Sequence, residues 1–245
     1  MRSLFSATCV LATLGTTAMA DEKPLKVLFI GNSYTYVNDL PGILVALADA
    51  AGGRKVVTDQ ETPGGCSFEK HVKDGKAATK IHKEKWDVVV LQDHSLSAVT
   101  NRALMRECAG KLHEEVKKSG ARSVFYLTWA RQKKPEMQDA LNEAYFGIAK
   151  DLGAVVAPVG MAWRRAMKDD PNLVLHSADG SHPAPAESYL AACVFYATLL
   201  DKSPVGLPAE VKKGNKTLVK LDLGLAKRLQ EVAWKTVLEM KGDRR

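Results

Sequence analysis

Five short apolar runs alternate along the chain with longer segments in which hydrophobic residues recur at helical spacing. The runs predict strands within residues 26–31, 55–65, 86–92, 123–129 and 154–160, and the longer segments predict helices within 40–52, 67–84, 102–120, 135–153 and 186–201. A surface loop over residues 202–217 and a last helix from about Asp222 complete the expected order. Strands that alternate with helices in this way predict a parallel sheet.

The predicted strands are apolar through their middles rather than at every second position. Such runs are typical of strands that helices cover on both faces of the sheet. The sequence therefore predicts an α/β protein, a flavodoxin-like three-layer α/β/α sandwich with a central parallel sheet of about five strands. No internal repeat or low-complexity segment interrupts the pattern, so residues 21–245 are expected to form a single domain.

Each of the first four predicted strands leads into a polar or glycine-rich loop, and a fifth polar loop lies well after the fifth strand, just ahead of the late helix. In sequence order these loops are Gly31-Asn32-Ser33, "TPGGCS" over 62–67, "QDHS" over 92–95, "TWARQ" over 128–132 and "HSADGSHPAPAES" over 176–188. Parallel strands bring their carboxyl ends to one edge of the sheet, where ligands bind in open α/β folds. We therefore expect the functional site at this edge.

Ser33 is the candidate nucleophile of that site. A serine hydroxyl needs an imidazole to accept its proton and a carboxylate to orient the imidazole. His182 lies in "DGSHP" with Asp179 three residues before it, a spacing at which the carboxylate can reach Nδ1 of the ring. The alternative is an ordinary Asp-Gly turn with a histidine near the start of the following helix.

The same segment allows a metal site, because His176, Asp179 and His182 recur at three-residue intervals. Gly180 and the prolines that follow argue against a helix, so the three side chains should not share a face. We expect no metal and no other cofactor.

The order of these motifs resembles that of the SGNH (GDSL-type) hydrolase superfamily, and most closely a bacterial branch with "GNSYT", "LQxxS" and "DGxHPxPAxxYL". The similarity covers nearly all of residues 21–245. It implies that Ser33 is the nucleophile, His182 the base and Asp179 the orienting acid. It further implies that the backbone N–H groups of Ser33 and Gly65 belong to the oxyanion hole.

The third motif departs from the family pattern. The family has Gly-x-Asn-Asp there, and its Asn side chain donates to the oxyanion, whereas this chain has Gln92-Asp93-His94-Ser95. Gln92 carries an amide of the right chemistry, so we expect it to be the third donor of the oxyanion hole. The alternative is that it only braces neighbouring loops.

The resemblance implies a serine esterase that cleaves an ester of a small molecule or glycan, with acetyl or short acyl groups as candidates. Asn32, Tyr34, Trp129 and Arg131 are candidate substrate-binding residues, with Trp129 offering a face to a sugar ring or, alternatively, packing in the core. Tyr36 could form the rim of the site. Two other classes stay open: a carbohydrate-binding protein on a degenerate hydrolase fold, and a phosphate or nucleotide binder using "TPGGCS", which lacks the lysine of a P-loop.

Residues 1–20 have the pattern of a secretory signal peptide: Arg2, an apolar stretch and Ala-Met-Ala. This predicts cleavage near Ala20 and a periplasmic or secreted protein, with a retained anchor as the alternative. The formal net charge of +7 is spread over helical segments without an arginine-rich stripe, so no nucleic acid partner is expected. Neither the motifs nor the charge pattern indicates an oligomeric state.

Overall fold

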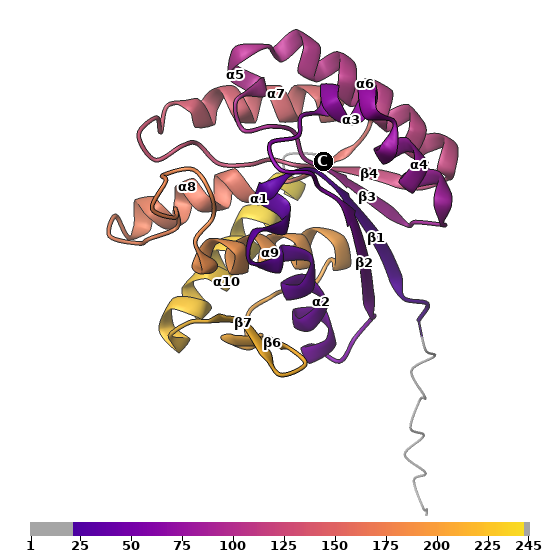
Figure 1. Ribbon diagram of the computed structural model, residues 1–245. Coiled ribbons are helices and arrows are strands. Elements are labelled where there is room, and N and C mark those ends of the chain that lie inside the picture. The colour runs from indigo at the N-terminus through magenta and orange to yellow at the C-terminus, as the bar shows by residue number, and fades with distance from the viewer. Residues whose placement is uncertain (1–21, 243–245) are drawn as a thin grey trace, which may run out of the picture.

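The computed structural model describes residues 22–242, and the predicted signal peptide at 1–20 lies outside them. Its centre is one parallel sheet with the strand order β2-β1-β3-β4-β5 (Figure 1). The strands are β1 (Leu25–Ile30), β2 (Val56–Glu61), β3 (Val88–Leu91), β4 (Arg122–Tyr126) and β5 (Val155–Ala157). The predicted α/β class and five-stranded parallel sheet are confirmed.

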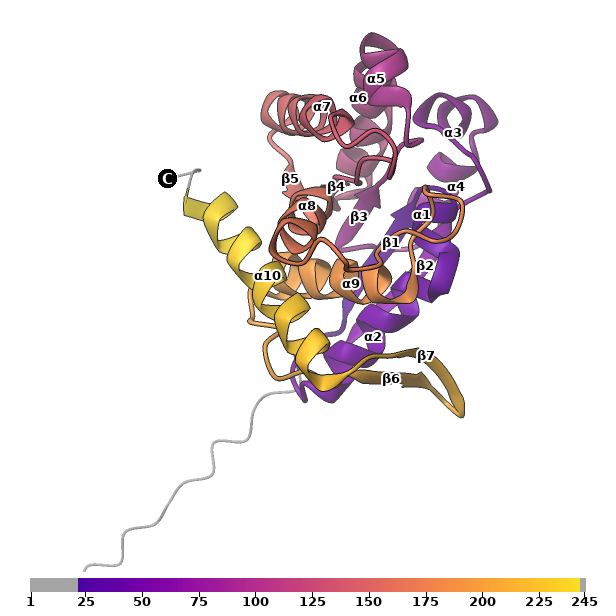
Figure 2. The ribbon, with the colours of Figure 1, turned by 90° about the vertical axis from the view of Figure 1, so that its left-hand side faces the viewer.

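Helices cover both faces of this sheet, as Figure 2 shows from the side. On one face lie α2 (Leu40–Ala50), α8 (Val159–Asp169) and α9 (Pro185–Leu200), and α10 (Leu223–Gly242) packs against α8 and α9. The other packs against α3 (Phe68–Asp74), α4 (Lys76–Lys83), α5 (Ser97–Thr100), α6 (Arg102–Ser119) and α7 (Met137–Leu152). Val27 and Phe29 of β1 enter the first core and Leu28 and Ile30 the second, as the period of a strand requires.

Helix α9 occupies the middle of its layer and is buried around most of its circumference. Its sequence is apolar on nearly every side, which is typical of a helix that other elements surround. Pro185 lies at the first turn, where a missing N–H leaves no hydrogen bond unmade. The helix therefore fixes the position of the loop that carries His182 just before it.

The predicted element order needs three corrections. The expected loop over 202–217 contains part of an antiparallel hairpin, β6 (Glu210–Lys213) and β7 (Lys216–Lys220), which lies against α2. Helix α8 was not predicted, and the expected helix over 67–84 is two helices separated at Gly75, whose φ is 68°. Within residues 22–242, no helix combines the length and apolar composition that a membrane span requires.

Candidate active site

Ser33 begins a one-turn helix, α1 (Ser33–Tyr36), directly beyond the carboxyl end of β1; a 3-10 turn, η1 (Val37–Asp39), follows. The preceding Asn32 caps the turn, because its side chain accepts a hydrogen bond from the Tyr34 N–H at 3.0 Å. A Cβ atom on Gly31 would lie 2.6 Å from Oε1 of Gln92, so only glycine allows the close approach between the first and third loops. The strand thus ends in glycine for packing reasons, and Ser33 is held on the corner that follows.

The structure brings Ser33, His182 and Asp179 into one hydrogen-bonded chain. Nε2 of His182 lies 2.9 Å from the Ser33 hydroxyl oxygen, across 149 residues of sequence. Nδ1 of the same ring lies 2.5 Å from Oδ2 of Asp179. With the Nδ1 proton donated to the carboxylate, Nε2 is free to accept the proton of the serine hydroxyl.

A turn around Asp179 holds its carboxylate in place. Oδ1 accepts hydrogen bonds from the backbone N–H groups of Ser181 and His182, each at 2.9 Å, and from the Ser177 hydroxyl at 2.8 Å. The bond from the His182 side chain, followed by these N–H groups, holds the pKa of the Asp179 carboxyl far below its usual range. Asp179 is therefore an anion throughout the neutral range, as an orienting acid must be.

Two backbone donors lie free on the loops around Ser33. Among the residues that the structure describes, neither the Ser33 N–H nor the Gly65 N–H has a hydrogen-bond acceptor. Gly65 has a φ of 63°, a conformation that favours glycine, and it is exposed. Both groups are thus available to an incoming oxygen, in line with the expected oxyanion hole.

Gln92 is not placed as a third donor, and this corrects the expectation from the sequence. Its side chain has no exposed area. Oε1 accepts from the Asn32 N–H at 2.9 Å and the Thr35 hydroxyl at 3.0 Å, and Nε2 donates to the Asp93 carbonyl. The amide is therefore bonded wholly within the protein and braces the first and third loops.

Asn32 is likewise buried, with 2% of its surface exposed, and cannot contact substrate directly. Its Nδ2 donates to the Cys66 carbonyl at 2.8 Å and lies 3.5 Å from the Asp93 carbonyl. One side chain thus links the loops after β1, β2 and β3. Its role is to hold the loops that carry Ser33 and Gly65 in register.

Tyr34 and Trp129 form part of the core instead of a sugar-binding surface. Trp129 has no exposed area and Tyr34 has 4%. The Tyr34 hydroxyl lies 2.6 Å from the Ser181 hydroxyl, and Nε1 of Trp129 donates to the Ser181 carbonyl at 3.0 Å. Both side chains therefore hold the segment that precedes His182, which corrects their expected role in substrate binding.

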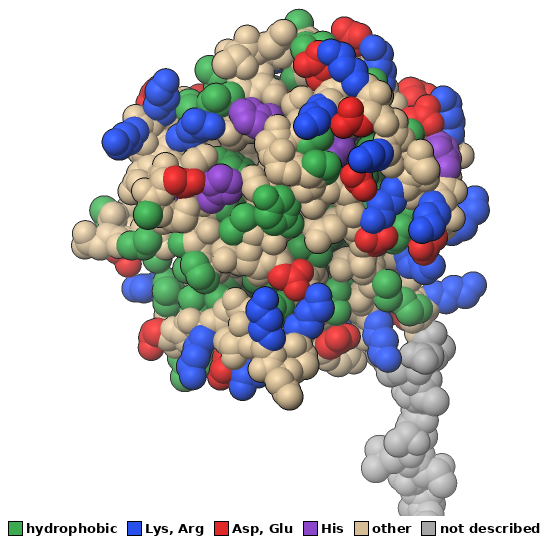
Figure 3. Space-filling view, viewed as in Figure 1, with side chains coloured by type: hydrophobic (Ala, Val, Ile, Leu, Met, Phe, Trp, Pro, Cys, Tyr) green, Lys and Arg blue, Asp and Glu red, His purple; other side chains and the backbone are tan. Residues whose placement is uncertain are grey.

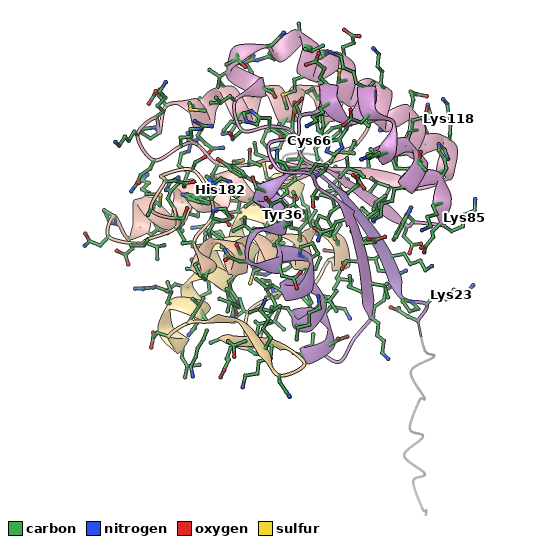
Figure 4. The ribbon with its side chains drawn as sticks, viewed as in Figure 1. Lys23, Tyr36, Cys66, Lys85, Lys118 and His182 are labelled. Carbon is green, nitrogen blue, oxygen red and sulfur yellow. The ribbon has the colours of Figure 1, made fainter. Side chains whose placement is uncertain are left out.

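Exposed groups that remain around the triad are few. Tyr36 is 43% exposed, and Figure 4 shows it with His182 and Cys66 around α1, each from a different segment. Arg131 is half-buried and donates to the Ser95 hydroxyl at 3.2 Å. Tyr36 and Arg131 are thus the sequence-predicted residues still positioned to meet a substrate.

The alternative metal site is not assembled. Nε2 of His176 donates to the Ala130 carbonyl at 3.0 Å, while His182 points to Ser33. Over residues 22–242, no cluster of three or more His, Cys, Asp or Glu side chains is arranged to hold a metal ion.

Asn38 is a residue of the site that the sequence did not reveal. Its Nδ2 donates to the Pro183 carbonyl at 3.1 Å and to the Ser188 hydroxyl at 3.0 Å, which ties η1 to the end of the loop bearing His182 and to the start of α9. Its φ of 59° is in the left-handed region, which asparagine tolerates better than most residues. The consecutive Asn38 and Asp39 are a sequence signal from which such a turn could have been predicted.

A comparison with solved structures places these features among known proteins. A protein from Slackia heliotrinireducens, described as an SGNH hydrolase, is 30% identical, with a TM-score of 0.62 over 72% of this chain and 100% of that one. A DUF4886 family protein from Bacteroides uniformis is 20% identical, with a TM-score of 0.69 over 88% of this chain and 95% of that one.

An acetyl-xylooligosaccharide esterase from Geobacillus has the same fold. It is 13% identical to this chain, with a TM-score of 0.57 over 80% of this chain and 100% of that one. No protein-family model and no curated protein sequence matches the chain.

Proposed function

The chain belongs to the SGNH hydrolase superfamily, and from this premise we propose that it is a serine esterase whose nucleophile is Ser33. The observation that carries the proposal is the hydrogen-bonded chain from the Ser33 hydroxyl through His182 to Asp179. A degenerate binding protein would have no need for this arrangement. The intact chain therefore supports the enzyme over the carbohydrate-binding alternative.

The proposed reaction is acyl transfer in two steps. The Ser33 oxygen attacks the ester carbonyl carbon while Nε2 of His182 takes the hydroxyl proton, and the same nitrogen then gives that proton to the departing alcohol. Water repeats the sequence on the acyl-enzyme and releases the acid. Asp179 remains ionised throughout and stabilises the imidazolium that forms in each step.

The negative charge that develops on the carbonyl oxygen needs donors that are already oriented. The free N–H groups of Ser33 and Gly65 are the two supported by the structure, and the first also lies at a helix start, where backbone N–H groups favour an anion. With Gln92 and Asn32 bonded internally, the proposed hole has two backbone donors in place of the usual three donors.

The substrate proposed is an ester of a small molecule or glycan, with an acetyl or short acyl group as the acid part. The fold is shared with an acetyl-xylooligosaccharide esterase, which makes acylated sugars a suitable first class to assay. A periplasmic or secreted location, proposed from residues 1–20, suits an extracellular glycan.

The proposal is tested with Ser33→Ala. Hydrolysis of 4-nitrophenyl acetate and acetylated xylo-oligosaccharides should fall by about 10³-fold or more, while the circular dichroism spectrum stays unchanged. A fluorophosphonate should label the wild-type protein at Ser33 and leave Ser33→Ala unlabelled. Activity above about a tenth of the wild-type value in the variant would refute Ser33 as the nucleophile.

A further inference from the structure

The loop between β4 and α7 carries a guanidinium group to the edge of the site. Arg131 donates through Nη2 to the Ser95 hydroxyl at 3.2 Å, while its Nε is buried without a hydrogen-bond partner. The charge of Arg131 also acts on the nearby Tyr34 hydroxyl, which lies 2.6 Å from that of Ser181. Arg131 therefore lies close to a side chain that bonds the residue next to His182.

Within the part of the chain that the structure describes, this guanidinium has no counter-ion. Across residues 22–242, no carboxylate lies within ion-pair distance of Arg131, Lys133 or Lys134, whereas Arg102, Arg164 and Arg165 each pair with one. Figure 3 shows Lys and Arg side chains gathered over this loop at the upper left. The exposed Glu136 is the acidic residue of the loop and makes no ion pair with its neighbours.

Neighbouring titratable groups do not supply the missing negative charge. Burial, and next the charge of Arg131, lower the pKa of His94, so this imidazole is neutral at pH 7. Burial raises the pKa of Tyr34, so its hydroxyl is neutral as well. Asp179, the anion of the proposed triad, is bound to His182. An unpaired, half-buried cation is thus left beside an ester-cleaving site.

The loop is fixed to the turn that carries the triad. The Gln132 N–H donates to the Gly180 carbonyl at 2.9 Å, one residue from Asp179. Beside it is a cavity of about 130 Å³ whose lining includes Arg131, Gln132, Arg164 and His176 but none of the three residues of the proposed triad. The hydrogen bond from Gln132 therefore holds the loop that carries Arg131 next to the turn that carries Asp179 and His182.

We propose that Arg131 binds a carboxylate of the substrate, so that the enzyme prefers esters that bear a negative charge close to the scissile bond. A guanidinium presents a planar pair of donors that matches a carboxylate, and Lys133 and Lys134 add a field that attracts anions. On a glycan, this describes an acyl group on or next to an acidic sugar. The inference rests on the proposed esterase function and names its substrate class.

The test compares esters in which the same carboxylate is free or masked as a methyl ester. The first pair is 4-acetoxybenzoate and methyl 4-acetoxybenzoate, with the charge on the leaving group. The second is mono-4-nitrophenyl glutarate and its methyl ester, with the charge on the acyl group. We expect wild-type protein to favour the free carboxylate in at least one pair, and Arg131→Gln to lower that ratio of kcat/KM by about 10-fold or more.

Two further variants isolate the role of the guanidinium. Arg131→Lys should retain part of the preference, because the charge stays while the planar donor pair is lost. Arg54 lies just before β2, at the amino ends of the strands and so at the opposite edge of the sheet from the site. Arg54→Gln removes a cation there and should leave the ratio of kcat/KM unchanged. Raising NaCl from about 0.05 to 0.5 M should reduce the wild-type preference.

The outcomes separate the two proposals. If the ratio of kcat/KM for the free ester to that for the masked ester is the same in wild-type and Arg131→Gln protein, the role of Arg131 is overturned. The proposed esterase function would be unaffected by that result. Hydrolysis of none of the four esters would count against the esterase. In that case, calorimetry would measure the binding of galacturonate and of galactose to Ser33→Ala protein. Binding of galacturonate but not galactose, lost in the double variant that also carries Arg131→Gln, would still support carboxylate recognition. Equal binding of both sugars, or binding of neither, would refute it.

Discussion

The ring of Tyr34 is stacked on the ring of Trp129, with 4.5 Å between their centroids and 3° between their planes. The two side chains also hold the same residue, since one bonds the hydroxyl of Ser181 and the other its carbonyl. Trp129 in turn stacks on Trp163, which packs against His176. A continuous series of packed aromatic rings thus runs from Tyr34 in α1 to His176 and Ser181, at the two ends of the loop that precedes the proposed base.

Tyr34→Phe should lower kcat by about 3- to 10-fold with little change in Tm. The variant keeps the stacked ring and loses only the bond to Ser181, so the base loop should become less well oriented at an energetic cost of about 1 kcal/mol. Measurement of kcat and of Tm by thermal unfolding on the same preparation checks this. Tyr196→Phe, at a buried tyrosine in α9, is the matched control and should leave kcat unchanged; an equal loss in both variants would refute a specific role for Tyr34.

Asp179→Asn should reduce kcat by about 10³- to 10⁴-fold between pH 6 and 9. The amide would present a donor or a weaker acceptor to Nδ1 of His182 and would no longer stabilise the imidazolium. Ser177→Ala removes one hydrogen bond to the same carboxylate and is expected to cost less than about 10-fold. Similar losses in the two variants would show that Asp179 acts only through the shape of its turn.

Gln92→Ala should destabilise the fold rather than disable the chemistry. The change leaves the Asn32 N–H and the Thr35 hydroxyl without their acceptor in a buried site, which should lower the free energy of unfolding by about 1–3 kcal/mol. Turnover per folded molecule should stay within about 3-fold of wild type. A fall in kcat of about 10²-fold at unchanged stability would instead restore Gln92 as an oxyanion donor.

Asp93 should make the stability depend on pH between about 4 and 6. Burial raises the pKa of its carboxyl from 3.8 to about 6, so the folded protein binds the proton more tightly than the unfolded chain. The contribution of this group is therefore fully present below pH 3.8 and is lost as the pH rises through about 6.

Chemical unfolding of wild-type and Asp93→Asn protein at several pH values checks this. The free energy of unfolding of wild type, relative to the variant, should fall by roughly 1–3 kcal/mol between pH 4 and pH 7. The asparagine keeps an oxygen to accept from the Phe68 and His94 N–H groups, each now 2.7 Å from the carboxylate. A constant difference across the range would contradict the raised pKa.

The parallel sheet and the positions of Ser33, Asp179 and His182 followed from local patterns: apolar runs, glycine stops and a short spacing in one loop. The hairpin over Glu210–Lys220 did not, because its apolar side consists of little more than Val211 and Val219 among lysines. Such a hairpin owes its strands to packing on α2, which no local pattern records.

The errors within the site have a common cause. Asn32, Tyr34, Gln92 and Trp129 are side chains that can bind a substrate, and all four lie at the strand ends where substrates bind. Whether such a group faces the cleft or its neighbouring loops depends on contacts between residues about 60 positions apart, as in the bond from Asn32 to Gln92. Loop sequence gives the chemistry of a side chain but not its direction.

The distance of 149 residues between Ser33 and His182 has a consequence for biosynthesis. The proposed nucleophile is synthesised long before the proposed base, and α9, which positions the base loop, follows later still. Ser33 therefore has no base until the segment before α9 has been made and has packed beside the end of β1. Appearance of activity during refolding would accordingly time the last long-range step of folding, and not the formation of the first strands.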